Sequence, residues 1–167
     1  GLARYGIGVL QQPTRPYTLQ PPPTPERTMV AMAQFAVSAQ KDVAFRDKVT
    51  TLVQKISPRD YTSELYAILN WVRLNVRYVR DPVQFERVQT PQVTLSQGSG
   101  DCDDLACLIA AMTTCIGHPS RFAAGAFANN PHPSHVWDET FDSVTKCWLV
   151  LDPVPGKRAA EMLGRVT

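Results

Sequence analysis

Cys102 is the residue of this sequence best placed for covalent chemistry. It follows a Gly-Ser-Gly-Asp segment and precedes apolar residues at helical spacing, so it is predicted to open a buried helix. A cysteine there feels the positive end of the helix dipole and free backbone N–H groups, which lower its pKa and favour the nucleophilic thiolate. The carboxylates of Asp101, Asp103 and Asp104 oppose that effect because they disfavour a further negative charge. We therefore expect a basic partner from elsewhere in the chain.

Three histidines are candidates for that base. His118 falls just past the far end of the predicted helix, about a helix length from Cys102 at ~1.5 Å per residue. His132 lies between two prolines in a loop, whereas His135 begins a predicted strand that would fix its position. His135 is therefore the favoured base.

Asp152 is the candidate partner of His135. Strands are predicted over residues 134–141 and 146–151, and the four residues between them fit a hairpin loop. A hairpin brings the end of one strand beside the start of the other, so Asp152 can face His135. Cys102, His135 and Asp152 would then act as nucleophile, base and orienting carboxylate. On these residues alone, the alternative is a buried cysteine with two unrelated polar side chains.

The elements that must position these residues fall into two groups. Apolar spacings of three and four predict helices over residues 28–40, about 45–56, and from 60 or 62 to about 79. Residues 81–101 are polar and rich in glycine and proline, which predicts a long connection.

The second group follows the Cys102 helix, which is predicted to end at Gly117. The pattern then shifts to a period of two, with a further strand over 121–127 and a short helix near 156–164. The predicted fold is α+β, with the nucleophile helix packed on an antiparallel sheet of at least three strands.

The first 27 residues differ from the rest of the chain. Six prolines within the first 25 residues predict an extended arm before a domain at 28–167. The arm is either a mobile tail or a strap along a partner or the domain itself, with Tyr5, Tyr17 and Leu19 as anchors. The chain starts at Gly1 without Met or a leader, which suggests a processed or partial chain.

The composition narrows the class of protein. The chain has 167 residues, 44% of them hydrophobic, and no apolar run near the ~20 residues of a bilayer helix, so no membrane partner is expected. The net charge of +2 suggests no nucleic-acid partner. Four cysteines without a C-x-x-C pair suggest reduced thiols and no metal or other cofactor. Three of them are interpreted as inert small hydrophobes inside helices or strands: Cys107, Cys115 and Cys147.

Four short motifs also follow one another in a distinctive order. They are Gly-Asp-Cys-Asp-Asp at 100–104, Gly-His-Pro-Ser-Arg at 117–121, Ser-His-Val-Trp at 134–137 and Trp-Leu-Val-Leu-Asp-Pro at 148–153. Over about residues 60–155 the pattern resembles the transglutaminase-like superfamily of papain-like thiol enzymes. The resemblance implies a papain-like fold with Cys102 as nucleophile, His135 as base and Asp152 as orienting carboxylate.

Residues 86–91 further resemble a branch of that family found in bacteria and their phages, which implies a location in the bacterial cytoplasm or a phage virion. The chain lacks the extra domains and the acidic calcium loop of animal transglutaminases. The family also contains peptidases, amidases, cross-linking enzymes and inactive members. Transglutaminase activity therefore does not follow from the resemblance.

These observations predict a thiol enzyme of acyl transfer on amide bonds. It would be a cysteine peptidase or amidase, or a transglutaminase, with a peptide or protein amide as its substrate. The oxyanion would be held by the Cys102 backbone N–H and a side chain, for which Gln97 is a candidate by analogy with papain-like enzymes; an exposed loop amide is the alternative. The alternative function is a structural or virion-assembly protein, with an idle triad and residues 1–27 docking a protein partner.

Overall fold

The structure is a computed structural model that describes residues 2–6, 24–81, 87–125 and 135–154. Along the chain, its elements are β1 (Leu2–Gly6), α1 (Pro25–Ala39), α2 (Val43–Val53), α3 (Tyr61–Asn75), β2 (Arg77–Tyr78), α4 (Pro91–Gln97), β3 (Ser99–Gly100), α5 (Cys102–Cys115), β4 (Ser120–Gly125), β5 (His135–Asp142) and β6 (Cys147–Leu151). No described helix combines the length and the apolar character that a bilayer crossing requires.

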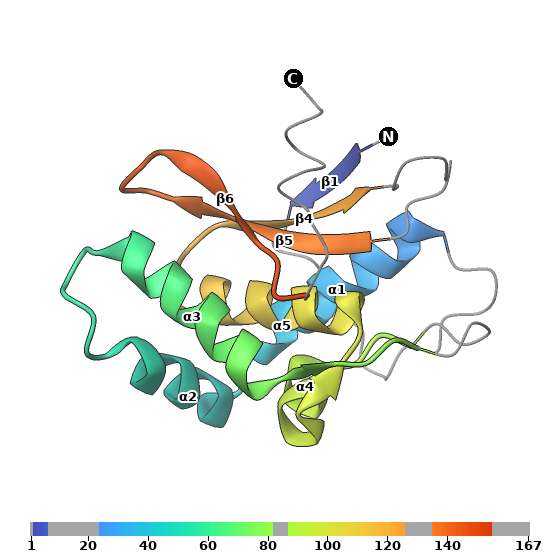
Figure 1. The fold of residues 1–167 in the computed structure, drawn as a ribbon, viewed down its shortest axis with the longest axis horizontal. Helices are drawn as coiled ribbons and strands as arrows, with labels where there is room; N and C mark the ends of the chain where they lie inside the picture. The colour runs from blue at the N-terminus through green and yellow to red at the C-terminus, as the bar shows by residue number, and fades with distance from the viewer. Residues whose placement is uncertain (1, 7–23, 82–86, 126–134, 155–167) are drawn as a thin grey trace.

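An antiparallel sheet with the strand order β1-β4-β5-β6 forms one layer of the molecule. The helices form the other layer, and α5 runs beneath β5 (Figure 1). The shared core is apolar, and α5 supplies its centre because the side chains from Leu105 to Met112 are all buried. Burial of this helix on every side explains why its sequence is nearly all apolar.

Side-chain caps determine where the described helices begin. Each follows a Thr or Asp whose side-chain oxygen accepts the backbone N–H three residues further on, which satisfies a donor that the helix itself leaves unpaired. The caps are Thr24, Asp42, Asp60, Thr90 and Asp101. The predicted helices over 28–40, 45–56 and 102–117 are thus present with shifted ends.

The prediction of a connection over residues 81–101 was wrong in part, because α4 and β3 lie within it. The signals were present: Thr90 caps the helix, Pro91 occupies its first turn, and Gly98 ends it with a φ of 66°. The third predicted helix is shorter than expected, since it ends at Asn75. Beyond it, the Arg77 and Val79 N–H groups bond to the β3 segment, each at 2.8 Å, so β2 and β3 pair in parallel.

Part of the segment predicted to be an extended arm forms regular secondary structure. Leu2–Gly6 forms edge strand β1, which lies along the domain itself, and α1 begins at Pro25 rather than at residue 28. Residues 7–23 lie outside the described part, as do the predicted loop at 129–133 and the predicted closing helix at 156–164.

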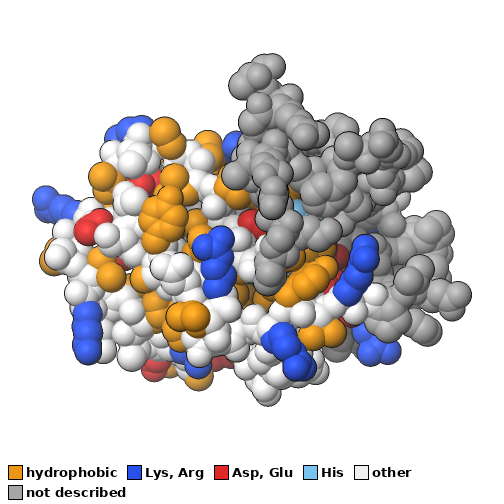
Figure 2. All heavy atoms as spheres, in the orientation of Figure 1, with side chains coloured by type: hydrophobic (Ala, Val, Ile, Leu, Met, Phe, Trp, Pro, Cys, Tyr) orange, Lys and Arg blue, Asp and Glu red, His pale blue; other side chains and the backbone are white. Residues whose placement is uncertain are grey.

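The face of the molecule in Figure 2 carries mixed side chains. Lys and Arg side chains stand apart from one another there, among hydrophobic and uncharged groups. The exposed large apolar side chains of this chain include Tyr66 and Leu74 on α3 and Val79 just beyond β2. The described residues on this face therefore form no continuous basic surface.

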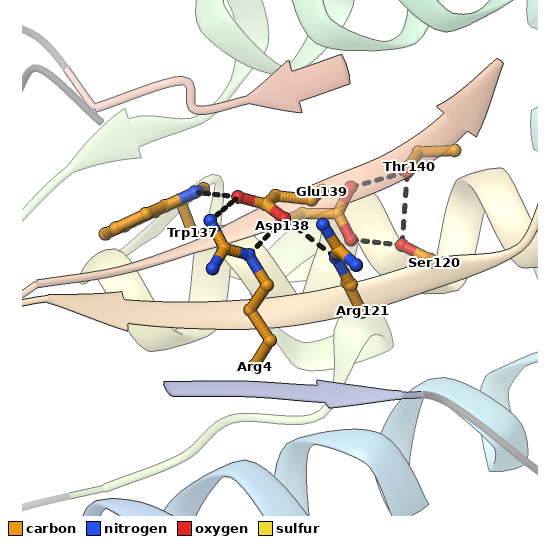
Figure 3. A network of polar contacts seen from close by, with 7 residues as sticks. All are labelled: Arg4, Ser120, Arg121, Trp137, Asp138, Glu139 and Thr140. Atoms are coloured by element: carbon orange, nitrogen blue, oxygen red, sulfur yellow. Dashed lines mark hydrogen bonds and ion pairs between the residues drawn. The ribbon is translucent and has the colours of Figure 1, made fainter. Parts of the chain in front are cut away.

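A buried carboxyl group, Asp138, joins the sheet to α5 through hydroxyl groups. It accepts hydrogen bonds from Ser120 and from Thr140, the latter at 2.6 Å (Figure 3). The Thr140 hydroxyl oxygen also lies 3.2 Å from that of Thr113 on α5. Burial raises the pKa of Asp138 to about 7, although the two hydroxyl groups oppose the shift. The folded protein therefore binds this proton more tightly than the unfolded chain does.

Asp138→Asn should flatten the pH dependence of stability. The contribution of Asp138 is fully present below its unfolded pKa of about 3.9 and is lost as the pH rises through its folded pKa. Denaturant unfolding of the parent should therefore give a smaller free energy of unfolding at pH 7.5 than at pH 5, and the variant should lose less over that interval. The matched control is Asp47→Asn, at an exposed position on α2. Equal losses in both variants and the parent would contradict the prediction.

Candidate active site

Cys102 occupies the first turn of α5, as predicted. A reciprocal capping box fixes this end of the helix: Asp101 accepts the Asp104 N–H, and Asp104 accepts the Asp101 N–H, each at 3.1 Å. The other oxygen of Asp104 accepts the Gln89 N–H at 2.7 Å. Asp104 thus ties the segment before α4 to the start of the nucleophile helix.

Gly100 is required by the same carboxyl group. A Cβ at this position would lie 2.6 Å from the Cβ of Asp104, and both atoms are close to rigid backbone. Any larger residue would push Asp104 out of its place in the capping box. The Gly-Asp-Cys-Asp-Asp motif is therefore explained by packing and capping around Cys102.

The Cys102 thiol is held neutral by its surroundings. Burial raises its pKa well above the ordinary value, and the charges of Asp103 and Asp101 raise it further. The Val136 backbone N–H bonds to the sulfur and lowers the pKa, but its effect is smaller. The expectation that the helix terminus lowers this pKa was therefore wrong, because burial and the carboxylates outweigh the dipole.

The carboxyl groups beside the thiol are themselves perturbed. Burial raises the pKa of Asp101 to about 9, and the charges of Asp103 and Asp104 add to the shift. Burial also raises the pKa of Asp104. Asp101 is consequently protonated at neutral pH, which reduces the number of negative charges that the thiol meets.

His135 and Asp152 form a close buried pair. The His135 Nε2 lies 2.7 Å from an Asp152 Oδ atom, and the two side chains are 1% and 6% exposed. Backbone contacts fix Asp152: its second oxygen accepts the Val154 N–H at 3.1 Å, and its carbonyl accepts from Arg73 of α3 at 3.0 Å. The hairpin between β5 and β6 thus makes the contact that its sequence predicts.

The contact between Cys102 and Val136 places the sulfur at the start of β5. Val136 directly follows His135 on β5, so its hydrogen bond to the sulfur brings the first residue of α5 to the first residues of β5. The first turn of α5 therefore reaches the backbone at the start of β5, and the His135–Asp152 pair lies at this same end of β5. Because Asp152 occupies Nε2, an exchange of protons with the thiol would use Nδ1.

The remaining histidines and cysteines have other surroundings. His118 is buried, lies 3.0 Å from Glu64 and meets the Tyr61 ring edge-on, which is a structural role. His132 lies outside the described residues. Cys107 is buried, as predicted, whereas Cys147 is exposed at the start of β6.

Gln97 is exposed at the end of α4, and along the chain β3 and Asp101 separate it from Cys102. Its role as an oxyanion donor remains a prediction. Sequence reasoning missed Tyr78, which is partly buried on β2 opposite Gly100. Burial is the main cause that raises the pKa of Tyr78, and the electrostatic effect of Cys102 is the second. This phenol therefore keeps its proton and can donate a hydrogen bond. Its position inside a helical apolar pattern concealed it.

Within the described ranges, no group of three or more His, Cys, Asp or Glu side chains is arranged to hold a metal ion. The candidate residues are a thiol, an imidazole and a carboxylate. This set can pass a proton from a nucleophile to a leaving group.

Comparison with known proteins identifies the family and the fold. The family model described as the transglutaminase-like superfamily matches residues 50–153. A candidate cysteine protease of Cytophaga hutchinsonii has a similar structure, with a TM-score of 0.55 and 24% identity over 67% of this chain. A candidate protease of Parabacteroides distasonis gives 0.56 and 14% identity over 77%. The matches span 37% and 27% of those chains, respectively. No curated protein sequence matches the chain.

Asp103→Asn should increase the reactivity of Cys102. Removal of this charge lowers the pKa of the thiol, so alkylation by iodoacetamide at pH 8 should be at least about threefold faster. Adducts are quantified by mass spectrometry, with the exposed Cys147 of the same molecule as the reference thiol. Asp47→Asn serves as the charge-matched control and should change neither rate. A Cys102 rate that is unchanged in Asp103→Asn would show that the carboxylate does not control the thiol.

Proposed function

Because the chain belongs to the transglutaminase-like superfamily, we propose that it is a cysteine-nucleophile enzyme that cleaves peptide or protein amide bonds by acyl transfer. The observation that carries this proposal is the buried His135–Asp152 pair at the start of β5, the strand whose Val136 N–H bonds to the sulfur of Cys102. A carboxylate on one imidazole nitrogen fixes the tautomer and stabilises the imidazolium that forms on the other. The α+β fold that this chain shares with candidate proteases is consistent with that chemistry.

The raised pKa of Cys102 determines how the first step proceeds. A stable thiolate is disfavoured, so the proton leaves as the sulfur attacks, and His135 Nδ1 receives it. The new C–S bond produces a tetrahedral oxyanion, which the Cys102 backbone N–H at the start of α5 can stabilise. Breakage of the C–N bond then returns this proton to the leaving amine and yields a thioester.

The second oxyanion donor is a side chain. Gln97 is one candidate. The Tyr78 phenol is another: β2 places Tyr78 opposite Gly100, and Cys102 is among the groups that affect the pKa of this phenol. Either would donate to the oxygen that gains charge in the transition state. The pairing of β2 with β3 favours Tyr78.

The thioester has two exits. Water gives a carboxylic acid and makes the protein a peptidase or amidase, whereas a primary amine gives a new amide and makes it a transglutaminase. Hydrolysis is the exit that we propose. No observation on the described residues favours the alternative of a structural or virion-assembly protein, so the idle triad and the docking role of residues 1–27 stay predictions.

Cys102→Ala should abolish the acyl-transfer activity without changing the fold. The assay combines burst acylation by p-nitrophenyl acetate with mass spectrometry of a peptide library, with and without an added primary amine. Asp152→Asn should lower the acylation rate by about 10²–10⁴-fold, because the imidazole loses its orienting partner. Cys147→Ala is the control and should behave like the parent. A burst or cleavage that persists in Cys102→Ala would exclude Cys102 as the nucleophile.

A further inference from the structure

A continuous set of contacts joins the N-terminal strand to His135. Arg4 of β1 donates from Nε to Oε2 of Glu139 at 2.9 Å, and the Trp137 indole N–H donates to Oε1 of the same carboxylate at 3.3 Å (Figure 3). The Trp137 ring in turn stacks with the His135 imidazole, with centroids 5.7 Å apart and planes 30° apart. Arg4 and Glu139 are 135 residues apart in the sequence.

The geometry of β5 accounts for this alignment. Alternate residues of a strand share one face, so His135, Trp137 and Glu139 lie in a row along β5. All three are buried. Residues Val136, Asp138 and Thr140, which are also buried, occupy the other face. A displacement of Glu139 is therefore transmitted along the row to the imidazole and not directly to the face that packs on α5.

Glu139 depends on its cationic partners because its side chain is only 2% exposed. A buried carboxylate is costly unless it is paired and hydrogen-bonded. Here Arg121 of β4 also donates to Oε2, at 2.7 Å, and the two guanidinium groups lower the pKa of Glu139 against the effect of burial. Without Arg4, the carboxylate loses one of its two cations and is drawn toward Arg121.

Trp137 is the link between this carboxylate and the site. Its hydrogen bond to Glu139 fixes the rotation of the indole, and the fixed indole covers one face of the His135 ring. An imidazole whose face is covered and whose Nε2 is held by Asp152 has little freedom to leave the position that serves the thiol.

We propose that Glu139, held by Arg4 of β1, is a positioning residue that orients His135 through Trp137, so that the docked N-terminal strand forms part of the catalytic machinery. This inference rests on the proposed function of Cys102 and His135. It gives β1 a role in the reaction although none of its residues belongs to the triad. Loss of β1 from the sheet edge would then lower activity before it unfolds the domain.

A double-mutant cycle tests this role on the full-length chain. Arg4→Ala and Trp137→Phe should each slow acylation by p-nitrophenyl acetate about 3–10-fold, because either one releases the indole. The double variant should be no slower than Trp137→Phe alone, since Arg4 acts only through the indole. Arg4→Lys keeps the charge and should recover most of the rate. The proposal would be overturned if the rate reductions of the two single variants multiplied in the double variant, or if Arg4→Ala left the rate unchanged.

Two further measurements separate positioning from a general loss of stability. Thr140→Val disturbs the opposite face of β5 and should lower the melting temperature with little change in the acylation rate. In NMR spectra, Arg4→Ala should shift the ring protons of His135, which the indole shields, and leave those of His118 in place. Unshifted His135 signals would overturn the proposal. The NMR measurement needs no turnover. It can therefore test the positioning of His135 even if the Cys102→Ala assay shows that the proposed function is wrong.

Discussion

The packing of α5 against β5 is the constraint on which the candidate site depends. A nearly all-apolar helix must be buried on every side, and the sheet covers the side that faces β5. This contact brings the first residue of α5 to the first residues of β5, where the Val136 N–H meets the Cys102 sulfur. Core packing thus brings the candidate nucleophile to the strand that carries the candidate base, and the β5–β6 hairpin adds the carboxylate of Asp152.

The same burial sets the electrostatics of the site. A thiol among carboxyl groups in a water-poor environment stays protonated, and burial also raises the pKa values of Asp101 and of the more distant Asp138. Such a site does not store a reactive thiolate. In the mechanism that we propose, deprotonation is coupled to attack, which makes the position of His135 more important than the resting charge of Cys102. A thiol enzyme of this kind is expected to be sensitive to anything that moves its imidazole.

Part of this arrangement could be predicted from the sequence, because some of its features are determined by residues that are close together in the chain. The helix start at Cys102 is encoded by its capping residues, and the facing of His135 and Asp152 follows from two strand patterns and a short turn. The sign of the Cys102 pKa shift could not be predicted, because it depends on how deeply the fold buries the thiol. Tyr78 was missed because its pairing with Gly100 joins segments separated by a helix that polar composition concealed.

The N-terminal strand shows the limit of local patterns most clearly. Arg4 lies in a segment that proline content marks as an arm, and nothing near it in the sequence identifies a partner 135 residues away. The residue that Arg4 pairs with gives a clue. Glu139 is a carboxylate on a strand whose side chains are almost all buried, so a cation must lie beside it. Arg121 on the neighbouring strand supplies one charge, and the strand that covers the open edge of β4 supplies the second. A buried acid beside a candidate catalytic histidine is therefore a reason to search the distant ends of a chain for its counterion.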